Sequence, residues 1–410
     1  MTAAAASLRT DVRVIGLVGV AHGLSHFFQL CIPPLFPLIR DEFGASYAAL
    51  GAVLAAFYAV SGVMQTVAGF LVDRIGARMI LLAGLALIAG GTLAAGLVPS
   101  FEWLYVTAAI AGLGNSVFHP ADLALLNGKV EPKRLGYAFS VHGITGNFGW
   151  VLAPLFVIPV AQSNGWRAAL VAAGAIGLVF CAVIATQRVL GGELRQHPGA
   201  ASRASAGIAP LLARPVLLTF LFFFLYAVAL VAFQTFATAS LPGLHHVTLV
   251  AASTALTAFL IGGAVGILAG GVLAARTQRH NLVAAAGVSV PAVLALVIAE
   301  GEFGGPVLVA IMALTGFALG SIGPSRDIIV RSVAPPEARG KVYGFVYSGL
   351  DLAGLFAPLI FGWALDRGRP DLVFVGAAIF LVAAIPTVIQ MRRRGIAAAP
   401  GPAPAPRGSR

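Results

Sequence analysis

Two long stretches of this chain carry one pattern, repeated at a constant spacing. Residues 112–154 match residues 316–358 without a gap, and each matched position lies 204 residues after its counterpart. The matched pairs are Gly112 with Gly316, Pro120 with Pro324, Pro132 with Pro336, Gly136 with Gly340, and Ala153-Pro154 with Ala357-Pro358. Because the spacing is close to half of the 410-residue chain, the sequence predicts a fold built from two copies of one unit.

Both units are predicted to cross a membrane. The chain is 59% hydrophobic and 10% charged, whereas a soluble domain usually has about 25% charged residues. A helix needs roughly 20 apolar residues to cross a bilayer core, and long continuous runs argue against a β-barrel. We predict an all-α integral membrane protein with twelve transmembrane helices in two pseudo-symmetric six-helix bundles. The predicted spans are 14–39, 47–72, 79–98, 103–128, 136–161, 167–188, 215–240, 248–275, 281–299, 305–333, 341–365 and 372–391.

The segments between the spans predict how the chain is divided. Residues 189–214 are rich in Gly, Ala, Ser and Arg and have no run that could span a membrane, which is typical of a flexible linker. The end of the chain lacks periodicity, so we expect disorder there. The predicted units are a cytoplasmic tail (1–13), an N-terminal bundle (14–188), a cytoplasmic linker (189–214), a C-terminal bundle (215–391) and a basic, Pro-rich tail (392–410).

The positive charge predicts a topology and argues against a nucleic-acid partner. The net charge is +11, and the basic residues gather in the tails and in the even-numbered connections, as at Arg74, Lys133 and Arg276. Cytoplasmic loops of membrane proteins carry such an excess. We therefore expect both termini in the cytoplasm. The preference for Arg, Ala and Gly indicates a bacterial source, so the expected location is the inner membrane.

A motif between the second and third spans points to a family. Gly69, Asp73, Arg74, Gly76 and Arg78 form the pattern G-x-x-x-D-R-x-G-x-R. Here the chain resembles the major facilitator superfamily, in which this loop locks the cytoplasmic gate by contacting a helix of the other half. The second half has Ala275 and Gln278 where the acidic residue and the turn glycine would recur. The resemblance therefore implies that Asp73 is the gate residue.

Three short motifs in the first half resemble one branch of that superfamily. They are Ser25-His26-Phe27-Phe28, Ser116-Val-Phe-His119-Pro120 and Gly146-Asn147-Phe148-Gly149. They look like the fosmidomycin-resistance-type efflux branch, which implies proton-driven export of small drugs. An acidic residue typical of the first helix of that branch is replaced near Gln29-Leu30, which puts proton coupling at that position in doubt.

Polar side chains within the apolar spans are the candidate substrate site. They are costly in contact with lipid and should face the bundle interior. His22, His26 and Gln29 share one helix face because they lie at i, i+4 and i+7. In the superfamily, the first, fourth, seventh and tenth helices line the cavity. The substrate-binding candidates are His22, His26, Gln29, His119, His142, Asn147, Tyr226, Gln234, Arg326, Tyr347 and Asp351.

Titratable groups among these residues are the candidates for proton coupling. Histidine titrates near neutral pH, and desolvation can bring a buried carboxylate into that range. The candidates are Asp122, Asp351, His26 and His119. The alternative for each of them is a purely structural hydrogen bond between helices.

One basic residue, Arg326, is predicted to lie well inside a span. It could bind an anionic substrate group bidentately, or it could form a structural ion pair with Asp122 or Asp351. For Asp327, a local pair with Arg331 at i+4 is expected.

These predictions combine into a secondary transporter that works by alternating access, with a proton as the coupling ion and no cofactor. We expect proton-coupled efflux of a small organic molecule by a monomer in the lipid bilayer, and an anionic molecule is one candidate substrate. One alternative is transport of a transition metal or metal chelate, bound by His22, His26 and His119, since His22 and His26 have the i, i+4 spacing of paired ligands. A membrane enzyme or sensor is the remote alternative, because no nucleophile and base pattern and no phosphate-binding loop is present in the sequence.

Overall fold

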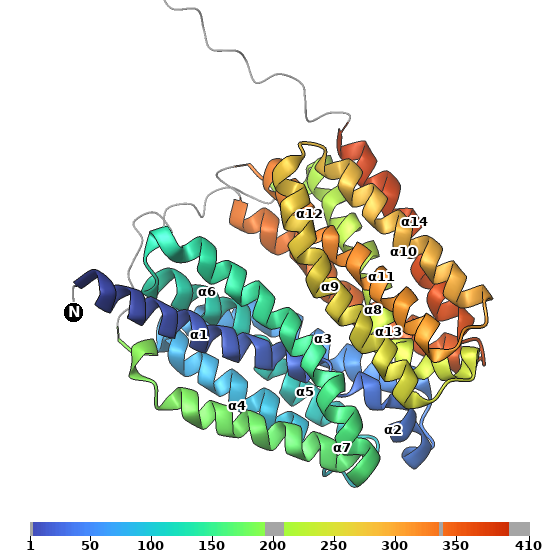
Figure 1. The fold of residues 1–410 in the computed structure, drawn as a ribbon. Helices are drawn as coiled ribbons and strands as arrows, with labels where there is room; N and C mark the ends of the chain where they lie inside the picture. Colours follow the sequence, from blue (N-terminus) through green and yellow to red (C-terminus); the bar gives the residue numbers. More distant parts are fainter. Residues whose placement is uncertain (1–2, 193–208, 336–338, 393–410) are drawn as a thin grey trace, which may run out of the picture.

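The computed structural model describes residues 3–192, 209–335 and 339–392, and all regular structure in these ranges is helical (Figure 1). The elements of the N-terminal half are α1 (Ala3–Gln29), η1 (Pro33–Leu35), α2 (Phe36–Phe43), α3 (Tyr47–Ile75), α4 (Ala77–Ala95), α5 (Trp103–Asn115), α6 (Phe118–Lys129), η2 (Pro132–Arg134), α7 (Leu135–Ala185) and η3 (Arg188–Leu190). Those of the C-terminal half are η5 (Ala209–Leu212), α8 (Arg214–His245), α9 (Leu249–Arg276), α10 (His280–Glu300), α11 (Gly305–Ser321), α12 (Gly323–Val333), α13 (Arg339–Asp366) and α14 (Asp371–Arg392).

Each of the twelve predicted spans lies mostly in helix, although the helices are divided differently and the first and tenth spans are interrupted. Ten helices in the described ranges are long and apolar enough to cross a membrane. The fifth and sixth spans are joined in α7, which bends at Gly165, where φ is +82°. The fourth span is divided between α5 and α6, neither of which is long enough alone. The fold is therefore the all-α membrane architecture that the sequence predicts.

Breaks in two helices fall at repeat-related positions. The chain leaves regular helix at Ser116 and Val117, between α5 and α6, and at Ile322, between α11 and α12. Pro120 and Pro324 follow these breaks, and proline lacks the N–H group that would continue the hydrogen-bond ladder of a helix. The two halves therefore place the residues just after each break, including Asp122 and Arg326, at matching points of the fold.

Helix α1 begins earlier than predicted. It starts at Ala3, inside the segment predicted to be a tail, and its first part is bonded to η2 and to the residue before η2. The carboxylate of Asp11 is buried, and it accepts hydrogen bonds from Arg134 Nε at 2.7 Å and from the Glu131 backbone N–H at 3.1 Å. Most of the predicted linker (193–208) and tail (393–410) lies outside the described residues.

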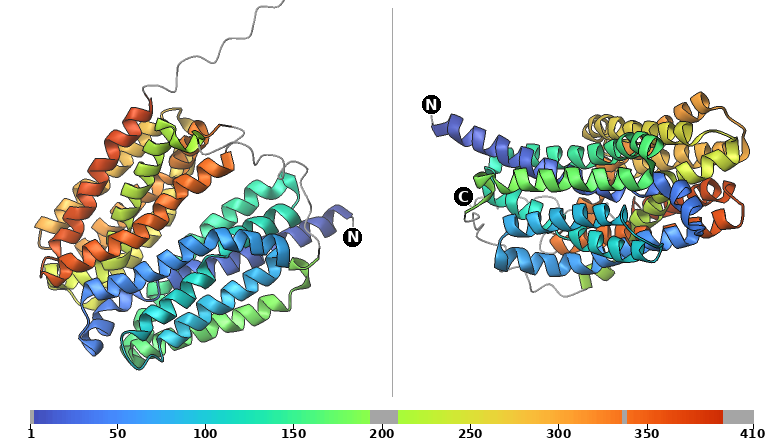
Figure 2. Two further views of the ribbon diagram at one scale, coloured as in Figure 1. Left: turned by 180° about the vertical axis from the view of Figure 1, so that it is seen from behind. Right: turned by 90° about the horizontal axis from the view of Figure 1, so that it is seen from below.

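The two bundles meet at one end and spread apart toward the other. Figures 1 and 2 show α3 against α13 near α2, whereas the helix ends beside the N-terminus diverge. The contact is close because it uses glycine: a Cβ atom added at Gly51 would lie 2.2 Å from the carbonyl oxygen of Pro358. At the same end, the carboxylate of Asp366 accepts hydrogen bonds from the backbone N–H groups of Tyr47 (2.6 Å) and Ala48 (2.8 Å).

Candidate functional site

Four imidazoles and one carboxylate form a cluster in the N-terminal bundle, with His119 exposed at its edge. Helix α1 supplies His22 and His26, α6 supplies His119 and Asp122, and α7 supplies His142. The rings of His22 and His142 stack at 3.5 Å between centroids, and those of His22 and His26 lie 4.5 Å apart. The sequence predicted that these spans contribute polar side chains, and the structure brings all five residues together. We call them the His–Asp cluster.

Glycine makes room for these rings between α1 and α7. A Cβ atom at Gly149 would lie 2.0 Å from the carbonyl oxygen of Gly23, so the two backbones are in direct contact. A Cβ atom at Gly146 would lie 2.9 Å from Nε2 of His22. A larger residue at either position would push α7 away from α1. The Gly146-Asn147-Phe148-Gly149 motif therefore positions the cluster.

The carboxylate of Asp122 is the centre of the cluster. Its side chain is 0% exposed, and its Oδ2 lies 3.1 Å from Nε2 of His142, which donates a hydrogen bond, and 3.2 Å from Nδ1 of His22. Within the described residues, no hydrogen bond reaches Asp122 Oδ1, Nδ1 of His22 or Nδ1 of His26. A buried carboxylate with so few donors is costly unless a proton or an imidazolium compensates it. The geometry therefore suits a site that binds a proton.

A chain of hydrogen bonds adjoins the cluster through Gln29. Its amide accepts from Trp150 Nε1 at 3.3 Å and donates to Asn115 at 2.9 Å, and Asn115 donates to Ser61 at 2.8 Å. The Trp150 ring lies 4.4 Å from that of His26. Sequence reasoning did not select Trp150 or Ser61, because both look like ordinary residues of an apolar helix. The Trp150 position, eight residues after His142 and hence on nearly the same helix face, was the one available signal.

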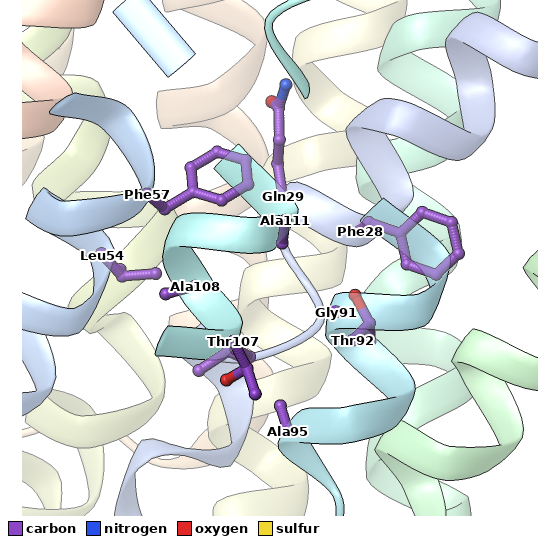
Figure 3. Close-up of a pocket in the computed structure, with 11 residues that line it drawn as sticks. Phe28, Gln29, Leu54, Phe57, Gly91, Thr92, Ala95, Thr107, Ala108 and Ala111 are labelled. Atoms are coloured by element: carbon purple, nitrogen blue, oxygen red, sulfur yellow. The ribbon is translucent and has the colours of Figure 1, made fainter. Parts of the chain in front are cut away.

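Gln29 also borders a small cavity (Figure 3). Its volume is about 20 Å³, and the apolar side chains of Phe28 and Phe57 and the hydroxyl groups of Thr92 and Thr107 are among its lining. That is roughly the space of one water molecule. The cavity is therefore too small to hold an organic substrate in this conformation.

The C-terminal bundle holds its buried charge differently. Arg326 on α12 is enclosed by aromatic rings: its Cζ lies 4.7 Å from the centroid of Phe223, 5.6 Å from Tyr226 and 5.8 Å from Tyr347. Its Nε donates to Oδ1 of Asp327 at 3.2 Å, and the same oxygen accepts from the Tyr347 hydroxyl at 2.8 Å. The predicted ion pairs of Arg326 with Asp122 or Asp351, and of Asp327 with Arg331, are thus replaced by the pair of neighbours Arg326 and Asp327. Phe223 was missed because a phenylalanine in an apolar helix carries no signal.

The two clusters occupy equivalent positions of the repeat. The 204-residue spacing carries Asp122 onto Arg326 and His22 onto Tyr226. In each half, the charged residue after the helix break contacts the ring on the first helix of that half. The same framework thus holds a titratable group in one half and a permanent cation in the other.

Besides Gln29, three predicted substrate residues lie outside both clusters. The side chain of Asn147 donates to Gly143 O in its own helix at 2.9 Å. Gln234 is half-buried on α8, with no hydrogen bond to another described residue. Asp351 is half-buried on α13 and faces α3, where a Cβ atom at Gly62 would lie 3.9 Å from its Cβ. The repeat correctly relates Asn147 to Asp351 in sequence, but Asn147 bonds to its own helix whereas Asp351 faces the other bundle.

The predicted gating motif is at the diverging end of α3. Gly76 adopts a φ of +99°, which favours glycine, and it ends the helix. Arg78 donates to Ala185 O of the same bundle. Asp73 is exposed beside a groove of about 360 Å³, and it makes no hydrogen bond or ion pair with any residue that the structure describes. The contact with the other half that the resemblance implies is therefore not formed in this conformation.

The cluster was also a candidate metal site. The structure groups one ligand atom each of His22, His119 and His142 within 4.8 Å of one another, rather than the predicted set of His22, His26 and His119. However, the planes of the His22 and His142 rings differ by only 20° at 3.5 Å. Nearly parallel stacked rings cannot both direct a lone pair at one ion, so a metal would require the rings to turn.

Comparison with known proteins identifies the family. The profile of the Major Facilitator Superfamily matches residues 18–244 and 224–409. The fosmidomycin resistance protein of Escherichia coli is 26% identical over 377 residues, which is 89% of this chain and 89% of that protein. The probable sulfoacetate transporter SauU of Cupriavidus necator is 27% identical over 397 residues, which is 90% of each chain.

A solved structure has the same fold. A bacterial homologue of the human lysosomal transporter Spinster, in an inward-facing and unoccupied conformation, superposes with a TM-score of 0.74 at 16% identity and covers 93% of this chain and 95% of its own. The family profile spans both bundles, as does the likeness in fold. The chain therefore belongs to the major facilitator superfamily, and it is a multi-pass membrane transporter and not an enzyme.

Proposed function

We propose that this protein is a secondary transporter that exports small organic molecules in exchange for protons by alternating access. The observation that carries the proposal is the fully buried Asp122, which is contacted by two imidazoles while one of its oxygens has no hydrogen-bond partner among the described residues. Alternating access would expose this cluster to one side of the membrane and then to the other. A proton would bind on one side and leave on the other.

Direction and substrate class draw on the relatives. One is named for resistance to fosmidomycin, which favours export, and another is named as a probable transporter of sulfoacetate, an organic acid. Acids are therefore the first substrates to test. The excess of basic residues in the loops favours an orientation in which the diverging ends of the bundles lie at the cytoplasmic face of a bacterial inner membrane. In this arrangement the present conformation would be open toward the cytoplasm and closed toward the outside.

The proposal is tested with the full chain in liposomes. Counterflow of labelled sulfoacetate and of fosmidomycin would show carrier activity, and an imposed pH gradient would show coupling. Asp122→Asn should keep counterflow but lose the response to the gradient, because the amide cannot bind the coupling proton. Asp41→Asn is the matched control, since Asp41 is an exposed carboxylate on α2.

Two results would reject proton coupling at the cluster. One is an Asp122→Asn variant whose pH response equals that of the wild type. The other is transport of Zn²⁺ or Ni²⁺, lost in His119→Ala, by liposomes that carry no organic substrate. The second result would instead establish metal transport.

A further inference from the structure

We infer that Arg326 and the three rings around it form a binding site for the oxyanion group of an organic acid: a carboxylate, sulfonate or phosphonate. This inference deepens the proposed function, because it assigns part of the substrate to particular atoms. It rests on which hydrogen-bond donors of Arg326 are occupied and which are not.

The guanidinium of Arg326 uses one of its nitrogen donors within the protein, and its two amino groups remain available to a ligand. Nε donates to Asp327. Among the described residues, no hydrogen bond to Nη1 or Nη2 is found, and neither atom is among the buried polar atoms that lack a partner. Both amino groups therefore reach accessible space, although the side chain as a whole is only 17% exposed. Two parallel N–H donors in this setting match the geometry of an oxyanion.

Among the described residues, Oδ1 of Asp327 is the one acceptor that the guanidinium of Arg326 uses, and the neighbouring tyrosine hydroxyls have other partners. The Tyr226 hydroxyl is used by Leu319 O, at 3.3 Å, and that of Tyr347 by Asp327. The ring faces of Phe223, Tyr226 and Tyr347 stabilise the cation and fix its plane. An arginine that served only to balance the charge of Asp327 would not need three aromatic rings around its guanidinium.

Binding of small oxyanions to the purified protein in detergent tests this site without a transport assay. Methylphosphonate, methanesulfonate and acetate are titrated by calorimetry, with uncharged dimethyl sulfone as the control ligand. We expect the anions to bind and the sulfone not to bind. Arg326→Lys keeps the charge but loses the two parallel N–H donors of the guanidinium. It should weaken anion binding about tenfold, in line with the strength of a charged hydrogen bond. Arg331→Lys, an exposed arginine later on α12, should bind as the wild type does.

Several results would overturn the inference. They are equal binding of the sulfone, unchanged affinity in Arg326→Lys, or an equal loss in Arg331→Lys, which would indicate general charge attraction. If Arg326→Lys elutes as aggregate, the double variant Arg326→Gln/Asp327→Asn, which leaves no unpaired charge, replaces it and should abolish anion binding. Unchanged anion affinity in these variants alongside proton-driven transport would reject this site and leave the proposed function standing.

A second inference rests on independent contacts at the end where the bundles meet. We infer that Gly362 and Asp366 form a latch that holds this end closed. Both carboxylate oxygens of Asp366 accept from the first N–H groups of α3, which belongs to the other bundle. A Cβ atom at Gly362 would lie 2.5 Å from Tyr47 O, so only glycine allows this approach. The same spacing occurs in two motifs, Gly362-x-x-x-Asp366-Arg367 on α13 and Gly69-x-x-x-Asp73-Arg74 on α3. They lie at opposite ends of the antiparallel pair of α3 and α13.

Spin labels report whether the latch holds. Glu102→Cys and Glu302→Cys place labels on exposed sites of the two bundles at this end, with Cys31 and Cys181 replaced by alanine. Adding Asp366→Ala removes the acceptor of the Tyr47 and Ala48 N–H groups, while Ser46 still caps α3. It should raise the ratio of long to short distances between the labels about tenfold. Asp366→Asn, which can still cap, should change it less. Asp371→Ala is the control, because Asp371 pairs with Arg369 of its own half at 2.6 Å. An unchanged distribution, or an equal change in the control, would reject the latch.

Discussion

At the scale of single residues, the two halves use opposite chemistry at matching positions. Asp122 is surrounded by imidazoles, so the charge of its cluster changes when one proton binds. Arg326 is surrounded by rings that do not titrate near neutral pH, so its charge is fixed. Under the proposed exchange of protons for an anion, the first cluster would bind the proton and the second the anion. This division explains why one framework could be kept in both halves while the side chains differ.

The contact of Asp122 with His142 leads to a prediction about stability. His142→Ala removes the hydrogen-bond donor at 3.1 Å and leaves the buried carboxylate uncompensated, which should destabilise the protein by about 3 kcal/mol. Asp122→Asn added to this variant should recover part of that loss, because no charge is then left buried. A double-mutant cycle of unfolding in detergent measures the coupling, which we expect to be about 1–3 kcal/mol. Strictly additive effects would mean that the two groups do not interact.

At the scale of helices, close contact between α1 and α7 depends on single glycines. Gly149→Val should separate the helices, because a Cβ atom there would lie 2.0 Å from Gly23 O, and overpacking of this kind costs about 1–3 kcal/mol or more. Gly143→Val is the matched control on the same helix, since no atom lies within 4 Å of its Cβ position. Thermal unfolding should show a lower midpoint for Gly149→Val alone. Equal midpoints would show that the backbone contact is not important for stability.

Much of the fold could be predicted from sequence, because apolar length and the 204-residue repeat are strong signals at the scale of helices. The pattern placed His22, His26, His119 and Asp122 on inward faces, and these residues do meet. It could not show that Asp351 faces α3 or that Asn147 bonds to its own helix. Helical spacing gives the face on which a residue lies, but not which neighbour that face contacts. Phe223 and Trp150 were missed for a related reason: an aromatic residue in an apolar helix usually only packs.

At the scale of the whole molecule, α3 and α13 run antiparallel, in contact at one end and separated at the other. Gly51 meets Pro358 at the closed end, and Gly62 meets Asp351 near the middle. Seven residues closer to the diverging end lie Gly69, after Gly62 on α3, and Gly344, before Asp351 on α13. This spacing keeps them on the same helix faces. Neither has an atom within 4 Å of its Cβ position. These two glycines are therefore placed to meet when the diverging ends close and the end at Asp366 opens.

Disulfide cross-linking tests this exchange of contacts. In a chain with Cys31 and Cys181 replaced by alanine, Gly69→Cys/Gly344→Cys should cross-link slowly, because the helix ends diverge here (Figure 2). Adding Asp366→Ala should speed the reaction, since release of one end of α3 favours closure of the other. Gly69→Cys/Gly271→Cys is the control pair, because Gly271 lies on α9, at an equally open position outside the α3–α13 pair. Faster cross-linking in both pairs would indicate general loosening of the bundles, whereas faster cross-linking of Gly69 with Gly344 alone would tie the closed end to the open one through a single pair of helices.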